Sequence, residues 1–134
     1  MGTNEFLTLA AFEEAYETVK KVADETKLVY SEYLSTQTGG RIYLKPENMQ
    51  YTGAYKLRGA YYKISTLSDE DKAKGLITAS AGNHAQGVAY AAQKYGVHAT
   101  IVMPTTTPLI KVNRTKALGA KVILEGDVYD EARE

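Results

Sequence analysis

The fold is decided by residues 76–103, which read LITASAGNHAQGVAYAAQKYGVHATIVM. Residues 76–79 form a short apolar run typical of a strand, residues 84–95 have helical apolar spacing, and residues 99–103 predict a second strand. Gly96 lies just past the helical pattern, where a helix commonly ends. A strand, a helix and a strand in this order predict a right-handed βαβ unit with parallel strands.

The same alternation continues toward the C-terminus. Residues 108–118 predict a helix that ends before Gly119, and residues 121–124 predict a third strand. The sequence therefore predicts the α/β class, with a parallel sheet of βαβ units covered by helices. Asp127 is predicted to be the N-cap of one more helix. Because a sheet of three parallel strands has two unprotected edges, we expect the chain to be a piece of a larger protein.

The N-terminal half is less regular. Residues 9–26 predict an amphipathic helix, residues 41–45 alternate like a strand, and residues 55–67 have a second helical pattern. Residues 36–40 predict a polar turn, and residues 68–71 a charged connector.

Composition narrows the possible functions. The 16 Lys and Arg residues balance 16 Asp and Glu residues, which argues against nucleic acid or a membrane surface as a partner. The chain has no cysteine, and its two histidines, His84 and His98, lack the paired spacing of a zinc site, so no metal is expected. Residues 1–12 lack the pattern of a signal peptide, and no apolar run is long enough to span a bilayer, so we expect a cytoplasmic location.

One candidate site follows the first strand of the βαβ unit. Ligands of open α/β sheets bind beyond the carboxyl ends of the strands, and the residues there are Ser80, Ala81, Gly82, Asn83 and His84. Backbone amides at the start of the following helix favour a carboxylate or a phosphate. The alternative is an ordinary helix cap formed by Ser80 or Asn83, with His84 merely exposed. The pattern alone leaves both interpretations open.

A second candidate is Lys56, which follows a turn and opens a helical pattern flanked by apolar residues. Partial desolvation there would lower the pKa of the lysine and suit Schiff-base chemistry. The alternative is a lysine that simply extends into solvent. The chain contains neither a G-x-S-x-G nucleophile motif nor a G-x-G-x-x-G or Walker glycine pattern.

Two segments in register resemble a known family. Residues 44–60, LKPENMQYTGAYKLRGA, resemble the cofactor-lysine segment of fold-type II pyridoxal-phosphate enzymes. Residues 80–87, SAGNHAQG, resemble the substrate-binding loop of the same enzymes, and residues 101–104, IVMP, also fit. The resemblance covers nearly the whole chain, and within the group it is strongest to threonine dehydratases (threonine ammonia-lyases), with serine racemases as near relatives.

The resemblance implies a role for each matching residue. Lys56 would bind pyridoxal 5'-phosphate covalently and shuttle the Cα proton, with Tyr55 beside the cofactor ring. Asn83 would hydrogen-bond the ring hydroxyl. Ser80, Asn83, His84 and the helix amides would hold the substrate carboxylate, in the loop that includes Ala81 and Gly82. Asn48 and Arg58 would brace the lysine segment without taking part in catalysis.

The implied reaction is β-elimination, which converts L-threonine to 2-oxobutanoate and ammonia. The implied setting is amino-acid metabolism, for example isoleucine biosynthesis, in a homo-oligomer; a catabolic role stays open. Two residues depart from the pattern. Ala54-Tyr55-Lys56 replaces the usual Ser-Phe-Lys, and Ala81 replaces a second serine that acts on the opposite face in serine racemases. The missing hydroxyl at Ala81 favours elimination over racemisation.

The resemblance also implies how the chain is divided. Residues 1–67 would be the N-terminal part of a large cofactor domain, and residues 68–134 a small α/β domain truncated at its C-terminal end. The family's phosphate cradle lies further downstream, so we expect the isolated chain to be weakly active or inactive. Two alternatives stay open: a serine dehydratase or racemase of the same fold, and a non-catalytic excised module that associates through its truncated face.

Overall fold

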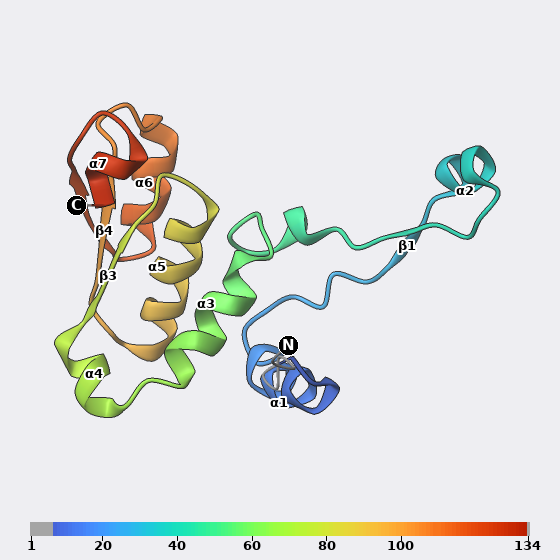
Figure 1. The fold of residues 1–134 in the computed structure, drawn as a ribbon, viewed down its shortest axis with the longest axis horizontal. Helices are drawn as coiled ribbons and strands as arrows, with labels where there is room; N and C mark the ends of the chain where they lie inside the picture. The colour runs from blue at the N-terminus through green and yellow to red at the C-terminus, as the bar shows by residue number, and fades with distance from the viewer. Residues whose placement is uncertain (1–6, 134) are drawn as a thin grey trace, which may run out of the picture.

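A three-stranded parallel sheet lies along one side of the main body (Figure 1). The strands are β3 (Leu76–Ala79), β4 (Ala99–Met103) and β5 (Lys121–Leu124), with β4 in the middle. Thr78 pairs with Ile101, which pairs in turn with Val122. The computed structural model describes residues 7–133. Residues 1–6 lie outside it, and they include the start of the stretch 1–12, which was predicted not to be a signal peptide. The predicted α/β class and the three strands predicted within residues 76–124 are confirmed.

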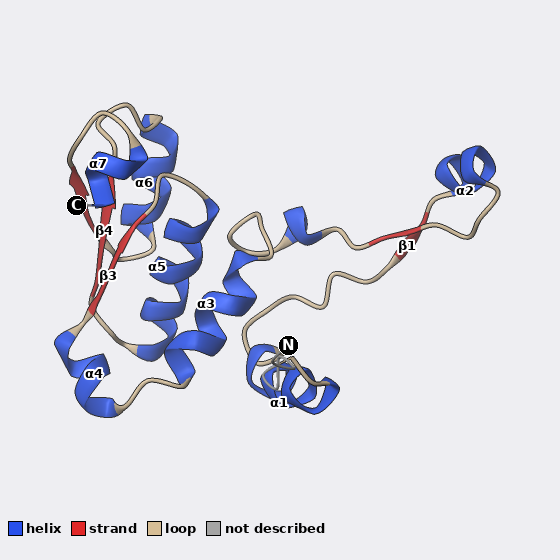
Figure 2. Cartoon of the chain, in the orientation of Figure 1, coloured by secondary structure: helices blue, strands red, loops and turns tan. Residues whose placement is uncertain are grey.

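Two helices lie alongside the strands and form the core with them (Figure 2). They are α5 (Asn83–Tyr95) and α6 (Leu109–Ala117), and both match the predicted helices to within one residue at each end. The buried side of α5 consists largely of alanines, which lets the helix approach the fully buried Ile101 and Met103 closely. Gly96 has a φ of 66° and ends α5, as predicted.

Helix α7 (Tyr129–Arg133) contacts β3 and β4 near the end of the chain. The prediction of Asp127 as its N-cap is wrong, because the helix begins only at Tyr129. The Asp127 carboxylate instead accepts a hydrogen bond from the hydroxyl of Thr105 at 3.0 Å, and its backbone N–H donates to Glu131 at 2.7 Å. This carboxylate therefore joins the loops after β4 and β5.

Helix α3 (Lys56–Ser65) packs along α5, and α1 (Leu9–Val19) packs against α3. Residues 68–71, predicted as a connector, instead begin α4 (Asp69–Lys74), because the hydroxyl of Ser68 accepts from the Asp71 N–H and acidic residues fill the first turn. Helix α1 ends seven residues before the predicted residue 26. The backbone near Asp24 bonds to the Gln50 side chain rather than continuing the helix.

An arm projects from this body between α1 and α3 (Figure 1). It contains the antiparallel pair β1 (Val29–Tyr30) and β2 (Tyr43–Leu44), with α2 (Glu32–Thr38) between them, and the 3₁₀ turn η1 (Glu47–Met49) follows. The predicted strand 41–45 is thus reduced to two residues. The predicted turn 36–40 is mostly helix, because Ser31 caps α2 and Gly39, at φ 70°, ends it.

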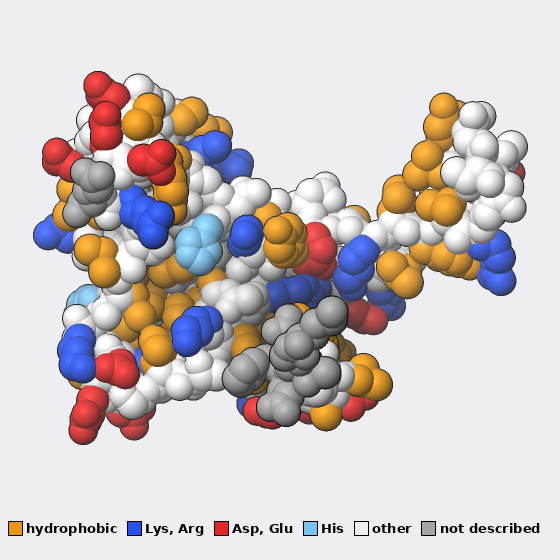
Figure 3. Space-filling view, viewed as in Figure 1, with side chains coloured by type: hydrophobic (Ala, Val, Ile, Leu, Met, Phe, Trp, Pro, Cys, Tyr) orange, Lys and Arg blue, Asp and Glu red, His pale blue; other side chains and the backbone are white. Residues whose placement is uncertain are grey.

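Exposed apolar side chains gather on the arm (Figure 3). They are Leu28, Val29, Tyr30, Tyr33, Tyr43 and Leu44. Because a two-stranded ribbon is marginally stable by itself, the arm depends on the way its base is held. Within residues 7–133, none of the helices combines the length and apolar character needed to cross a bilayer.

Candidate active site

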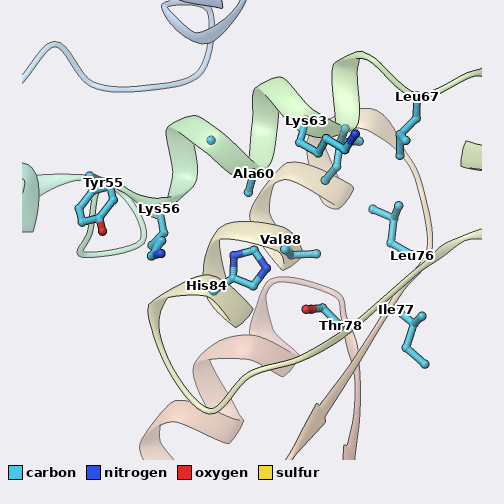
Figure 4. Close-up of a pocket in the computed structure, with 12 residues that line it drawn as sticks. Tyr55, Lys56, Ala60, Lys63, Leu67, Leu76, Ile77, Thr78, His84 and Val88 are labelled. Carbon is cyan, nitrogen blue, oxygen red and sulfur yellow. The ribbon is translucent and has the colours of Figure 1, made fainter. Parts of the chain in front are cut away.

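A cavity of about 510 Å³ opens between α3, β3 and the start of α5 (Figure 4). Lys56 and Lys63 of α3 and His84 of α5 contribute its basic groups, and no carboxylate occurs among the described residues that line it. Its floor is apolar and includes Leu76 and Val88. A concave, mostly apolar site with an excess of positive charge suits a small anionic ligand.

Lys56 is the first residue of α3, directly after the turn that contains Tyr55. Its ammonium lies 5.5 Å from the centre of the Tyr55 ring, within the range of a cation–π contact. Both side chains are exposed at the mouth of the cavity. Among the residues that the structure describes, the apolar neighbours of Lys56 therefore do not desolvate its ammonium, and that expectation is wrong. The side chain leaves the helix on the side that faces solvent.

The loop between β3 and α5 is shaped by Ser80. Its hydroxyl accepts hydrogen bonds from the backbone N–H groups of Gly82, at 3.3 Å, and Ala85, at 3.2 Å. Ser80 thus performs the capping that the sequence left open, while Gly82 occupies the N-cap position without a side-chain bond. Asn83 and His84 follow as the first exposed residues of α5, where backbone amides lack acceptors within the helix.

His84 faces the cavity together with Lys56 (Figure 4). Partial burial, and secondarily the positive charge of Lys56, lower the pKa of His84 below its ordinary value of 6.5. The lowered pKa favours the neutral imidazole, which donates one hydrogen bond through one ring nitrogen and accepts one through the other.

The backbone of Lys56 lies unusually close to α5. A Cβ atom built on Gly87 would lie 3.1 Å from the carbonyl carbon and oxygen of Lys56, and 3.2 Å from the Leu57 nitrogen. Glycine at this position lets the two helices cross in direct contact. The start of α3 is thereby held against the start of α5, which brings Lys56 to the loop 80–84.

Replacing Gly87 with alanine is expected to lower the free energy of unfolding by about 1 kcal/mol, because overpacking outweighs the gain in helix propensity. The matched control is Gly59→Ala in α3, where the new Cβ would meet no atom within 4 Å. That variant is expected to stabilise the chain by roughly 0.5–1 kcal/mol. Urea unfolding followed by circular dichroism measures both. Equal stabilisation by the two substitutions would contradict the close contact.

The structure brings Tyr55, Lys56 and His84 to one cavity, whereas Ser80 caps the adjoining loop and Asn83 is exposed at its end. Ala81 and Gly82 are half-buried within the loop. Sequence reasoning missed Lys63 as a lining residue. Its spacing of seven residues from Lys56 could have revealed it, because positions two helical turns apart share a face.

The family model described as "Pyridoxal-phosphate dependent enzyme" matches residues 19–134. The chain belongs to this family. The resemblance seen in its two motifs is therefore confirmed. L-threonine ammonia-lyase of Thermotoga maritima is 57% identical over 128 residues, a match that covers 96% of this chain and 32% of that protein.

Solved structures of this family agree with the fold. The processed form of threonine deaminase isoform 2 from Solanum lycopersicum is 46% identical with a TM-score of 0.81, covering 90% of this chain and 36% of that one. Maize serine racemase is 33% identical with a TM-score of 0.87, covering 92% of this chain and 38% of that one. The chain spans only part of the length of the curated relatives that it matches. It covers 32% of the Thermotoga maritima protein and 39% of an L-threonine dehydratase from Staphylococcus aureus.

Proposed function

We propose that this chain supplies the lysine-bearing N-terminal part of a pyridoxal-phosphate-dependent L-threonine ammonia-lyase, which converts L-threonine to 2-oxobutanoate and ammonia by β-elimination. The observation that carries the proposal is that Lys56 and His84, which come from two separate helices, line the same cavity. The threonine enzymes named among the relatives support the choice of substrate. The remainder of such an active site would come from segments that this chain does not contain.

The lining of the cavity fits the cofactor. Lys56 presents a primary amine at the mouth, Tyr55 offers an aromatic face beside it, and the absence of carboxylates among the described lining residues suits an anionic group. We assign covalent attachment to Lys56, contact with the ring hydroxyl to Asn83, and contact with the ring to Tyr55. When bound, pyridoxal phosphate supplies an electron sink that stabilises negative charge at Cα of the substrate.

The residues of the chain would orient the substrate and move one proton. The amides at the start of α5, in the loop shaped by Ser80, bind the substrate carboxylate, and His84 contributes a neutral hydrogen-bonding group beside it. Fixing the carboxylate determines which bond at Cα is broken, which is a positioning effect. The amine of Lys56 would remove the Cα proton. The electron pair left at Cα would form the Cα–Cβ double bond as the Cβ–O bond breaks, and the β-hydroxyl would take up a proton and leave as water.

We also propose the division into residues 1–67, belonging to a larger cofactor domain, and residues 68–134, belonging to a smaller α/β domain. In this arrangement Lys56 and the loop 80–84 come from different domains and meet through the contact at Gly87. A homo-oligomer is proposed for the whole protein.

A chimaeric enzyme tests the function directly. In it, this chain replaces the corresponding N-terminal part of the Thermotoga maritima protein, to which it is 57% identical. We expect pyridoxal-phosphate-dependent release of 2-oxobutanoate from L-threonine by the chimaera, and little or none by the isolated chain. A folded chimaera that binds the cofactor but turns over no hydroxy amino acid would overturn the proposal.

A serine racemase is the second candidate, because two serine racemases superpose on the chain with a TM-score of 0.87 each. Ala81 distinguishes the two activities. In the chimaera, Ala81→Ser is expected to raise the formation of D-serine from L-serine by about tenfold, because a hydroxyl on the second face can return the proton there. Chiral chromatography measures the product. Ala79→Ser, at another half-buried alanine nearby, is the control; equal D-serine from both variants would contradict the role of position 81.

A further inference from the structure

The start of α3 is joined to the base of the arm by an ion pair. Arg58 lies in the first turn of α3, two residues after Lys56, and Glu47 opens the turn η1 after β2. Nε of Arg58 donates to Oε2 of Glu47 at 2.9 Å, and Nη2 donates to Oε1 at 2.8 Å. Only 28% of the Arg58 side chain and 18% of the Glu47 side chain are exposed. The pair is therefore bidentate and partly shielded from solvent.

Further hydrogen bonds tie the other end of the arm into the same cluster. The hydroxyl of Thr26, which precedes β1, donates to Oε1 of Glu47 at 2.5 Å. The buried side chain of Gln50 accepts from the Asp24 N–H at 3.0 Å and donates to the Asp24 carbonyl at 2.7 Å. Arg58 donates to that same carbonyl at 3.1 Å. Both ends of the arm are thus fastened to the first turn of α3.

The first turn of α3 needs such support because its local cap is weak. Tyr55, at the N-cap position, has helical dihedral angles and makes no side-chain hydrogen bond to the helix. On one side, Gly87 of α5 is in close contact with the Lys56 backbone. On the other side, Arg58 is held by Glu47. The backbone of Lys56 is therefore fixed between α5 and the base of the arm.

We propose that Arg58 and Glu47 are positioning residues for Lys56, which hold the first turn of α3 so that the lysine side chain leaves the helix toward His84. The inference rests on the role of Lys56 proposed above. Neither residue is among those that line the cavity, so both act through the backbone. The planar guanidinium holds the turn more firmly than a lysine would, because a lysine keeps the charge but cannot form two parallel hydrogen bonds to one carboxylate.

The reactivity of Lys56 in the full 134-residue chain tests this role without an activity assay. The chain is incubated with pyridoxal phosphate, the adducts are reduced with borohydride, and peptide mass spectrometry gives the labelling of each lysine. Lys63 is an internal reference, because it lies on the same helix and lines the same cavity. We expect Lys56 to be labelled at least fivefold more than Lys63, a ratio that falls to about one in Arg58→Gln and is partly restored in Arg58→Lys.

Two control variants separate positioning from stability. Val112→Ala removes a buried side chain of α6 and weakens the fold away from Lys56, and Arg41→Gln removes an exposed arginine from the arm. Both are expected to keep the labelling ratio of the unchanged chain. An unchanged ratio in Arg58→Gln, or an equal fall in Val112→Ala, would overturn the positioning role and leave the proposed function standing. No preference for Lys56 in the unchanged chain would overturn the proposed role of Lys56, and this inference with it.

Discussion

Lys56→Ala is expected to lower the turnover of L-threonine by the chimaeric enzyme by at least about a thousandfold, because one substitution removes both the covalent attachment of the cofactor and the proton shuttle. Lys56 is the residue at the cavity mouth that combines a primary amine with a position beside the loop 80–84. The release of 2-oxobutanoate under saturating threonine and cofactor measures kcat. The folded state of each variant is checked by circular dichroism.

Two matched variants make the result specific. Lys63→Ala removes a second ammonium from the same helix and the same cavity, and is expected to retain turnover within about threefold, since it removes only long-range electrostatic attraction. Lys56→Arg keeps the positive charge but is expected to be as inactive as Lys56→Ala, because a guanidinium stays protonated. More than a tenth of the original turnover in Lys56→Ala would contradict the assignment.

The second large effect concerns stability. At pH 7, Glu47→Gln is expected to lower the free energy of unfolding by about 2 kcal/mol, because it leaves the partly buried Arg58 without its counter-charge. Hydrogen bonds from Arg58, followed by those from Thr26 and Gln50, lower the pKa of Glu47 from 4.5 to about 2 despite its partial burial. A full shift of this size corresponds to about 3 kcal/mol, and remaining contact with solvent reduces the expected effect.

The pH dependence follows from the direction of this shift. The pKa of Glu47 is lower in the folded chain than in the unfolded chain, so its contribution is complete above about pH 4.5 and is lost as the pH falls toward 2. The difference in the free energy of unfolding between the original chain and Glu47→Gln should therefore be constant near neutral pH. It should shrink toward zero as the pH falls toward 2. Urea unfolding at several pH values measures it. Glu13→Gln, at an exposed carboxylate of α1, should follow the original chain throughout, and a gap that persists at pH 2 would contradict the mechanism.

The body was predicted more accurately than the N-terminal half for a physical reason. Strands β3, β4 and β5 and helices α5 and α6 follow local apolar periodicity, which the core then uses without change. Helix α1 was predicted too long because the polar groups of the Asp24 backbone have a competing partner in Gln50. That partner lies 26 residues away, beyond the reach of any local pattern.

Some residues of the candidate site could likewise be predicted from the sequence, and others only from the structure. Lys56 and the loop 80–84 could be named from their motifs, and the capping role of Ser80 was one of two open interpretations. Gly87 and the partner of Arg58 could not be found in this way. Each depends on which helix face meets which neighbour, as in the contact between Gly87 and the Lys56 backbone.

By itself, the sequence determined the βαβ alternation, the family and the residue types available for chemistry, because periodicity and short motifs are local properties of the chain. The tertiary structure alone decided that Glu47 pairs with Arg58, that Gly87 contacts the backbone of Lys56, and that an arm projects with its apolar side chains exposed. These features arise from contacts between distant segments. Such contacts form only where burial and hydrogen bonding across the whole fold outweigh the local preferences of each segment.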